Sequence, residues 1–225
     1  MTKKAIVLLS GGLDSATALW WAVANGYRPS ALSVDYGQRH VRELESARAL
    51  ARDAGAELTA LSVRLPWLAA STSLVGSAKP LPDLPLARIG RDGIPSTYVP
   101  GRNTLLLSLA LSLADAQKAS AIVIGANVLD SSGYPDCRPP YLKAFEKAAR
   151  LGSRAGNGGH PVKILAPLLR LDKRGIVRLA KRLGVPVEKT WSCYRGGARP
   201  CGRCDSCKLR AKGFAEAAQR DPLAG

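Results

Sequence analysis

The feature that most constrains this chain is a glycine turn near its start. Residues 10–15 read Ser-Gly-Gly-Leu-Asp-Ser; they follow the apolar run of residues 5–9 and precede a helical pattern over residues 16–24. A strand, a tight glycine turn and a helix N-terminus together aim backbone N–H groups at an anion. Glycine also permits positive φ angles and close approach of a phosphate. The pattern therefore predicts a phosphate-binding loop, although Gly and Ser also occur in ordinary βα turns.

Strand and helix patterns alternate along the chain. Residues 31–34 and 57–65 read as strands, and residues 39–54 read as a helix with apolar side chains at helical spacing. Later segments continue the alternation: a buried helix over 103–116, a strand over 121–125, a helix over 139–151, a strand over 162–168 and an amphipathic helix over 172–183. Such alternation predicts an α/β fold with a doubly wound parallel sheet, whose ligands bind beyond the carboxyl ends of the strands. The glycine turn lies at that edge.

The charge balance points to anionic ligands without selecting one. The chain has 225 residues, which suits one α/β domain with an appendage. Its 33 Lys and Arg residues exceed its 17 Asp and Glu residues, and the formal charge of +16 favours nucleotides or RNA. The basic residues are dispersed, however. Those within residues 172–183 lie opposite an apolar stripe, as on a solvated helix face, so RNA binding and a generic basic surface are both open.

The distribution of apolar residues argues against membrane association. No run reaches the roughly 18 uninterrupted apolar residues of a membrane span. The first residues lead straight into a predicted core strand, which is not the pattern of a cleaved signal peptide. We therefore expect a soluble, cytoplasmic protein.

The cysteines form the second motif. Four of the five fall near the C-terminus in a C-x7-C-x2-C-x2-C pattern: Cys193, Cys201, Cys204 and Cys207. Each C-x2-C step can bring two thiolates to one metal ion, and four thiolates close a tetrahedral Zn²⁺ shell, so the pattern predicts a structural zinc site. An iron–sulfur cluster and disulfides are the alternatives, and the expected location disfavours disulfides. We predict a nucleotide-binding and catalytic domain over residues 1–190 and a small zinc-binding helical unit over residues 191–225.

Six motifs along the whole chain are similar to those of one enzyme family. They are residues 10–15 (SGGLDS), 35–40 (DYGQRH), 98–103 (YVPGRN), 132–139 (SGYPDCRP), 190–194 (TWSCY) and 200–207 (PCGRCDSC). The first alone resembles the loop of the PP-loop ATP pyrophosphatases, which activate carboxyl or carbonyl oxygens with ATP. Together with the cysteine quartet, the six resemble the 7-cyano-7-deazaguanine synthase family of the queuosine and archaeosine pathways.

The resemblance implies an ATP-dependent ligase that converts 7-carboxy-7-deazaguanine and ammonia to the nitrile through an adenylated carboxylate and an amide. A carboxylate is a poor electrophile, because its charge repels nucleophiles and oxide is a poor leaving group; attaching an adenylyl or phosphoryl group removes both obstacles. Release of AMP or of ADP is open. The resemblance also implies ATP, Mg²⁺ and Zn²⁺ as cofactors, a small-molecule substrate with no obligatory nucleic acid, and a homodimer.

Roles follow from the resemblance residue by residue. The segment expected to wrap the nucleotide comprises Leu8, Leu9, Ser10, Gly11, Gly12, Leu13, Asp14, Ser15, Ala16, Thr17 and Ala18. Asp14 is expected to hold Mg²⁺ beside the phosphates, and Arg102, after a rigid Pro-Gly pair, to stabilise phosphate charge in the transition state. Asp136 and Arg138 are expected to bind the guanine-like ring and its carboxylate, because a carboxylate accepts N–H donors and Arg pairs with anions in a bidentate manner.

Several other positions are ambiguous. Cys137 reads as a small buried residue more than as a nucleophile, and His40 and His160 read as structural. After Arg-Pro, the family usually has Glu and then an aromatic residue, whereas this chain has Pro140 and Tyr141. That departure leaves open a divergent enzyme that joins the activated base to another amine.

Two other classes of protein are alternatives. An RNA-modifying PP-loop enzyme, such as a tRNA thiolase, would explain the charge. An RNA-binding zinc module without catalysis would leave the glycine turn unexplained.

Overall fold

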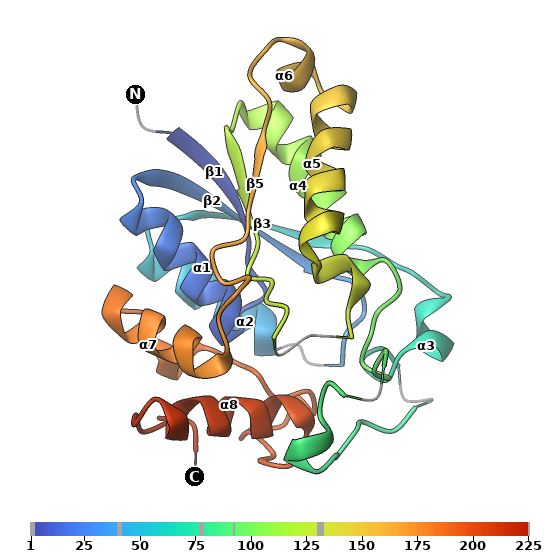
Figure 1. Ribbon diagram of the computed structural model, residues 1–225, viewed down its shortest axis with the longest axis vertical. Coiled ribbons are helices and arrows are strands. Elements are labelled where there is room, and N and C mark those ends of the chain that lie inside the picture. The colour runs from blue at the N-terminus through green and yellow to red at the C-terminus, as the bar shows by residue number, and fades with distance from the viewer. Residues whose placement is uncertain (1–2, 40–41, 77–78, 92, 130–132, 225) are drawn as a thin grey trace.

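The chain folds around one parallel β-sheet (Figure 1). The computed structural model describes residues 3–39, 42–76, 79–91, 93–129 and 133–224. The strands are β1 (Lys3–Leu8), β2 (Tyr27–Asp35), β3 (Glu57–Ser62), β4 (Ala121–Val123) and β5 (Lys163–Leu165). They lie in the order β3-β2-β1-β4-β5, and each neighbouring pair is parallel. The predicted parallel sheet is confirmed.

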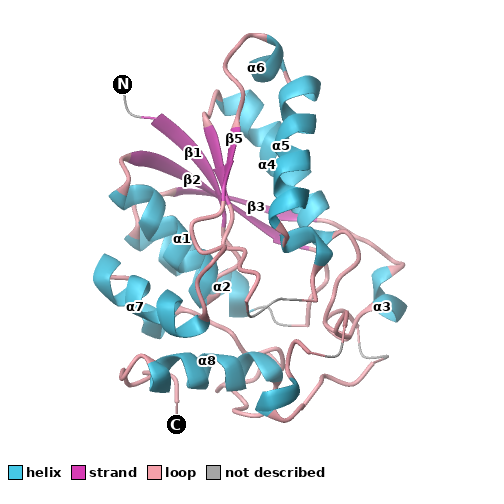
Figure 2. Cartoon of the chain, viewed as in Figure 1, coloured by secondary structure: helices cyan, strands magenta, loops and turns pink. Residues whose placement is uncertain are grey.

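Helices cover both faces of this sheet (Figure 2). One face carries α1 (Leu13–Ala24), α2 (Arg42–Asp53) and α7 (Lys173–Leu183), and the other carries α4 (Arg102–Gln117) and α5 (Pro139–Gly152). The two cores are separate because successive side chains of a strand point to opposite faces: Val7 belongs to the first core and Ile6 to the second. The shorter elements and the last helix are α3 (Leu68–Ser71), η1 (Leu86–Arg88), η2 (Pro135–Cys137), α6 (Arg154–Asn157), η3 (Val187–Lys189) and α8 (Asp205–Glu216).

The helix α4 differs from its prediction. Its apolar composition predicted burial on nearly every face, and this is wrong, because the helix forms an outer layer and buries one stripe. The buried residues are Asn103, Leu107, Ala110 and Ala114. The exposed residues, spaced by four, are Thr104, Ser108, Ser112 and Ala116. This stripe of small and hydroxyl side chains faces solvent, as the helical repeat requires.

The strand order places a crevice at one end of the sheet. From β1 the chain moves outward to β2 and β3, and it returns to the other side of β1 for β4 and β5. In doubly wound sheets the loops at such a reversal separate, and ligands bind outside the carboxyl ends of the two central strands. The turn after β1 and the segment after β4 meet at this point.

The C-terminal segment packs against the rest of the chain. Helix α8 lies beside α7 at the bottom of Figure 1, and Phe214 belongs to the core that includes α1 and α7. The backbone N–H of Trp191 donates to the carbonyl oxygen of Gly11 at 2.9 Å, so this segment touches the glycine turn. The boundary between residues 190 and 191 stays a prediction. Within the described ranges, no helix combines the length and apolar character needed to cross a membrane.

Candidate active site

The glycine turn leads from the carboxyl end of β1 directly into α1. Gly11 has a φ of +92°, and a Cβ there would overlap the carbonyl oxygen of Glu43 in α2, so the turn requires glycine at this position. Gly12 precedes α1 without a capping side chain, which leaves the first N–H groups of the helix for a ligand. The Ser15 hydroxyl lies 3.0 Å from that of Ser10. This geometry suits an anion.

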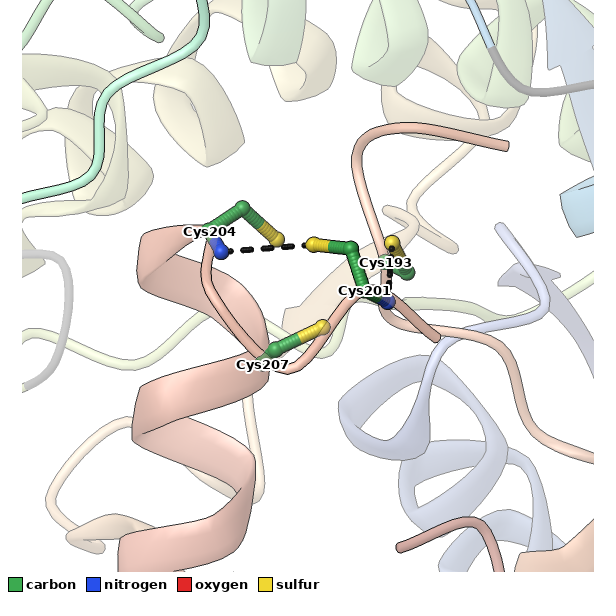
Figure 3. Close-up of side chains that lie close together, drawn as sticks. All are labelled: Cys193, Cys201, Cys204 and Cys207. Carbon is green, nitrogen blue, oxygen red and sulfur yellow. Dashed lines mark hydrogen bonds between the residues drawn. The ribbon is translucent and has the colours of Figure 1, made fainter. Parts of the chain in front are cut away.

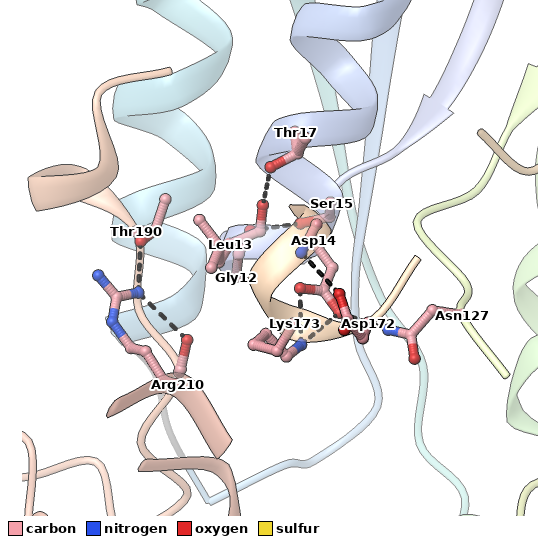
Figure 4. Close-up of polar contacts among 12 residues, drawn as sticks. Gly12, Leu13, Asp14, Ser15, Thr17, Asn127, Asp172, Lys173, Thr190 and Arg210 are labelled. Atoms are coloured by element: carbon pink, nitrogen blue, oxygen red, sulfur yellow. Dashed lines mark hydrogen bonds and ion pairs between the residues drawn. The ribbon is translucent and has the colours of Figure 1, made fainter. Parts of the chain in front are cut away.

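Asp14, the second residue of α1, forms a tight polar cluster with two remote residues (Figure 4). The Nζ of Lys173 lies 2.9 Å from both carboxylate oxygens of Asp14, and the Nδ2 of Asn127 donates to Oδ2 at 2.9 Å. The side chains of Lys173 and Asp14 are 14% and 26% exposed. The cluster joins the glycine turn, the segment after β4 and the start of α7.

Lys173 lines both cavities described below and contacts Asp14, but the sequence interpretation did not place it at the site. It was placed on a solvated helix face, and this is wrong because Lys173 is the first residue of α7 and lies at the sheet edge after β5. The other basic residues of that helix are exposed as predicted: Arg174, Arg178, Lys181 and Arg182. The sequence held one indication of this position: Asp172 is a typical N-cap residue, and it marks Lys173 as the start of the helix. In the structure Asp172 accepts the Gly175 N–H at 2.7 Å and starts the helix at the ligand-binding edge.

The start of α4 is held by Asp136 from η2. Asp136 is buried, and its Oδ2 accepts the backbone N–H of Asn103 at 3.0 Å. The Asn103 side-chain amide donates in return to the Asp136 carbonyl oxygen and to the Cys137 sulfur, each at 3.2 Å. A carboxylate at a helix N-terminus is stabilised by the hydrogen bond and by the helix dipole. Asp136 therefore anchors the helix that carries Arg102.

Arg102 and Cys137 are neighbours in the site, but the guanidinium of Arg102 is charged and the thiol of Cys137 is neutral. Burial opposes the charge of Arg102, but Tyr36, Tyr134, Cys137 and Asp136 around it raise the pKa of Arg102 above its ordinary value. Burial raises the pKa of the Cys137 thiol to about 11, so the thiol is neutral near pH 7. The site thus holds a fixed cation, and Cys137 behaves as the predicted small buried residue.

Two adjoining cavities open at this edge of the sheet. The larger has a volume of about 280 Å³ and is lined by the ends of β1, β2 and β4, the glycine turn and the start of α4. The smaller, of about 170 Å³, is lined by the segment between β3 and α4 and by the C-terminal segment. Asp14, Lys173 and Tyr134 line both cavities. The two cavities therefore meet at the Asp14–Lys173 pair.

Most residues expected to wrap a nucleotide line the larger cavity, as does Arg102. From the predicted segment these are Leu8, Leu9, Ser10, Gly12, Leu13, Asp14 and Ser15. The others lie outside its lining: Gly11, Ala16, Thr17 and Ala18. The last three are buried residues of α1 itself, which explains why they do not reach the cavity.

The residues expected to bind the ring lie elsewhere. Asp136 and Arg138 are outside the lining of both cavities, and Arg138 is an exposed residue at the start of α5. Pro140 lies in the first turn of the same helix, where a missing N–H carries no penalty. Pro140, which stands where the family usually has Glu, is therefore an exposed residue in the first turn of α5. His160 is exposed, and His40 lies outside the described residues.

The cysteine quartet forms a compact cluster before and at the start of α8 (Figure 3). The sulfurs of Cys193, Cys201, Cys204 and Cys207 all lie within 4.8 Å of one another, and the cysteines are free. Backbone N–H groups of Cys201 and Arg195 donate to the Cys193 sulfur at 3.3 and 3.4 Å. A tetrahedral zinc–thiolate shell has sulfurs about 3.8 Å apart. The ligand type and spacing therefore suit one zinc ion.

The fold has solved counterparts. One is a 4-thiouridine synthetase–RNA complex with bound ATP, with a TM-score of 0.50 and 21% identity over 96% of this chain and 50% of that chain. Another is the NMN synthetase from Francisella tularensis, with a TM-score of 0.51 and 17% identity over 97% of this chain and 78% of that chain. At these identities the likeness concerns the PP-loop-type fold alone.

Sequence comparisons give the family. The chain is 54% identical over 215 residues to a 7-cyano-7-deazaguanine synthase of Synechococcus elongatus, which covers 95% of this chain and 91% of the relative. It is 49% identical over 223 residues to one of Thermoplasma acidophilum, which covers 98% and 91%. The family model described as "Queuosine biosynthesis protein QueC" matches residues 4–218. With its glycine turn, parallel sheet and cysteine cluster, the chain belongs to the QueC family of queuosine biosynthesis proteins.

Proposed function

We propose that this protein is an ATP-dependent 7-cyano-7-deazaguanine synthase that acts on the free base 7-carboxy-7-deazaguanine with ammonia. The observation that carries the proposal is the Asp14–Lys173 pair, which joins a glycine turn suited to phosphates to a second cavity suited to another substrate. The name of the similar proteins supports the identity of the product. The reaction as proposed requires no nucleic acid.

The chemistry needs two activations. In the first, a carboxylate oxygen attacks the α-phosphorus of ATP and the bond to pyrophosphate breaks; ammonia then displaces AMP and loses a proton, which gives the amide. In the second, the amide oxygen attacks another ATP in the same way, and loss of AMP and protons from nitrogen leaves the nitrile. Each substrate oxygen leaves on AMP. Attack on the γ-phosphorus would release ADP instead, and nucleotide analysis distinguishes the two routes.

The residues of the site supply charge and position for these steps. The N–H groups at the start of α1 suit the phosphates. The Lys173 ammonium, held by Asp14, lies where the two cavities meet and balances the carboxylate and the developing phosphate charge. Arg102 adds a second fixed cation to the larger cavity. Preorganised charges of this kind lower the barrier because they need no rearrangement during the reaction.

Two metals fit the residues present. The Asp14 oxygens accept three hydrogen bonds, from Lys173 and Asn127, and keep capacity for a cation. Mg²⁺ commonly takes one or two carboxylates together with phosphate oxygens, so Asp14 would hold it and the ion would neutralise phosphate charge. The four clustered thiols fit Zn²⁺, and a shell closed by four protein ligands is structural.

The test is a product assay with the purified protein, ATP, Mg²⁺, ammonium and 7-carboxy-7-deazaguanine, followed by mass spectrometry. We expect the nitrile, a transient amide, and loss of both when ATP is omitted. Asp14→Ala should abolish ATP turnover with unchanged circular dichroism, because the Asp14 side chain projects from the first turn of α1 into the cavity and is not part of the core. Formation of a different amide with another amine, and no nitrile, would identify a divergent enzyme and contradict the proposal.

A further inference from the structure

The smaller cavity is not explained by the glycine turn. The proposed reaction joins two molecules at the α-phosphate, so the second substrate must lie against the nucleotide. The smaller cavity has this position, because it shares one wall with the larger cavity. The shared wall is formed by Leu13, Asp14, Tyr134, Lys173, Ser192, Tyr194 and Ser206.

The larger cavity has the character of the nucleotide side. At one end lies the glycine turn with its N–H groups. Part of the remaining lining is apolar and suits the flat faces of an adenine ring. This apolar part includes residues from β1, β2, α4 and the segment after β4: Leu8, Val34, Leu106, Ile124 and Ala126. A nucleotide in this cavity leaves the smaller one for the other substrate.

Arg210 lines the smaller cavity, but its guanidinium has no donor left for a ligand. It donates twice to Asp221, at 2.8 and 2.9 Å, and also to Thr190 at 2.7 Å. Longer bonds reach the Val187 carbonyl oxygen at 3.2 Å and the Ser192 hydroxyl at 3.4 Å. These bonds occupy the five N–H donors of an arginine. Arg210 therefore fixes the wall and does not bind an anionic substrate.

Asp205 is the carboxylate of the smaller cavity, and it keeps acceptor capacity. It is 7% exposed, and its Oδ1 accepts the backbone N–H of Leu84 at 3.0 Å. The nearby cations Arg203 and Lys208 pair with Asp83 instead, at 3.4 and 2.6 Å. In the described part of the chain, Asp205 has no ion-pair partner. A carboxylate buried to this degree is stabilised when N–H donors reach its remaining lone pairs.

The other walls of this cavity suit a flat ring. Tyr134 and Tyr194 contribute aromatic surface, and the Tyr134 hydroxyl is fixed 2.7 Å from that of Thr97. Aromatic walls with a few fixed polar groups are typical of sites for planar heterocycles. The cavity therefore combines ring-sized walls with one acceptor of N–H bonds.

We propose that the smaller cavity binds the bicyclic ring of the acid substrate, and that Asp205 accepts hydrogen bonds from the N1–H and the exocyclic amine of its guanine-like edge. This rests on the proposed function. The carboxylate of the same molecule, on the five-membered ring at the other side of the bicycle, then lies at the Asp14–Lys173 pair beside the α-phosphate. The assignment gives base recognition to the C-terminal segment and replaces the roles predicted for Asp136 and Arg138.

Calorimetric binding of 7-carboxy-7-deazaguanine to the full zinc-loaded chain, with a non-hydrolysable ATP analogue present, tests this. Asp205→Asn keeps an oxygen for the Leu84 N–H but sets an NH₂ group against the donors of the ring. We expect the Kd for the acid to rise at least about tenfold, as for lost bonds to a charged acceptor. The Kd for the ATP analogue and the zinc content should not change. An unchanged Kd for the acid overturns the assignment.

Asp83→Asn is the matched control. Asp83 pairs with Lys208 where residues 83 and 84 contact α8, the same contact in which Asp205 binds Leu84, but Asp83 lies outside the lining of both cavities. Its Kd values should equal those of the wild type. A second measurement needs no variant: an acid that lacks only the 2-amino group should bind the wild type at least about tenfold more weakly. Equal affinity of the two acids overturns the assignment even where Asp205→Asn fails to fold.

Nitrile formation, measured separately, distinguishes the two proposals. Acid binding that depends on Asp205 without nitrile formation contradicts the proposed function and supports the cavity assignment. Nitrile formation together with Asp205-independent binding overturns the cavity assignment and leaves the function. Absence of both product and acid binding overturns both.

Discussion

The glycine turn and the smaller cavity lie side by side at one sheet edge, but they are built in opposite ways. The turn is local: residues 10–15 carry its geometry in a single motif, and a strand and a helix hold it. The cavity is assembled from remote segments, with Asp14, Tyr134, Lys173 and Asp205 contributed by different parts of the chain. A local motif keeps its shape where its neighbours change, whereas an assembled wall depends on every segment being in place.

The largest effect expected from this difference follows loss of the metal. Cys204→Ser removes one of four ligands next to Asp205 and Ser206, so it should lower zinc content and reduce the melting temperature by about 10 °C or more. Amide hydrogen exchange should rise across α8 and stay unchanged in β1 and α1. Cys137→Ser is the control, because Cys137 lies outside the cluster. Equal exchange in both regions would contradict the comparison.

The next largest effect concerns the buried pair that fixes the cavity wall. The Arg210 and Asp221 side chains are 6% and 8% exposed, so Arg210→Met leaves an unpaired buried carboxylate. We expect the free energy of unfolding to fall by about 3–5 kcal/mol. Denaturant titration measures this.

Two variants sharpen the result. Lys212→Met, on the same helix, breaks an exposed pair with Glu216 and should cost at most about 0.5 kcal/mol. The double variant Arg210→Met/Asp221→Leu should recover much of the loss, because it removes the orphaned charge. A loss for Arg210→Met no larger than that for Lys212→Met would show that the wall does not depend on the pair.

Lys173→Met tests the contact between the glycine turn and the smaller cavity, because Lys173 pairs with Asp14 and lines that cavity. Removing its charge should lower kcat by about 100-fold or more, comparable to the loss of one preorganised charge-stabilising group. Arg178→Met is the control, since Arg178 is exposed on the same helix; it should retain wild-type kcat. Product formation over time measures both. A wild-type rate in Lys173→Met would remove Lys173 from the mechanism.

The same distinction explains what the sequence predicted and what it did not. The parallel sheet, the glycine turn and the cysteine cluster follow from spacing within short segments, where periodicity and turn chemistry fix the geometry. Lys173 was missed because helix periodicity reports which face a residue occupies but not that the first turn lies at a ligand-binding edge. The bond from Asp136 to the start of α4 was not predicted, because a carboxylate can satisfy a remote helix N-terminus as well as a ligand, and its partner Asn103 is identified only by the fold.

The smallest effect is expected at Cys137. Its thiol is buried and its pKa is raised to about 11, so it stays protonated at neutral pH and offers no thiolate nucleophile. Cys137→Ala should change kcat by less than about threefold, since only a small side chain is lost. Alkylation of the wild type should be slow at pH 7 and should rise until about pH 11, because only the thiolate reacts. Fast alkylation at pH 7 with loss of nitrile formation would instead make Cys137 a catalytic thiol, and the larger cavity, which Cys137 lines, would then act by covalent chemistry rather than by charge and position.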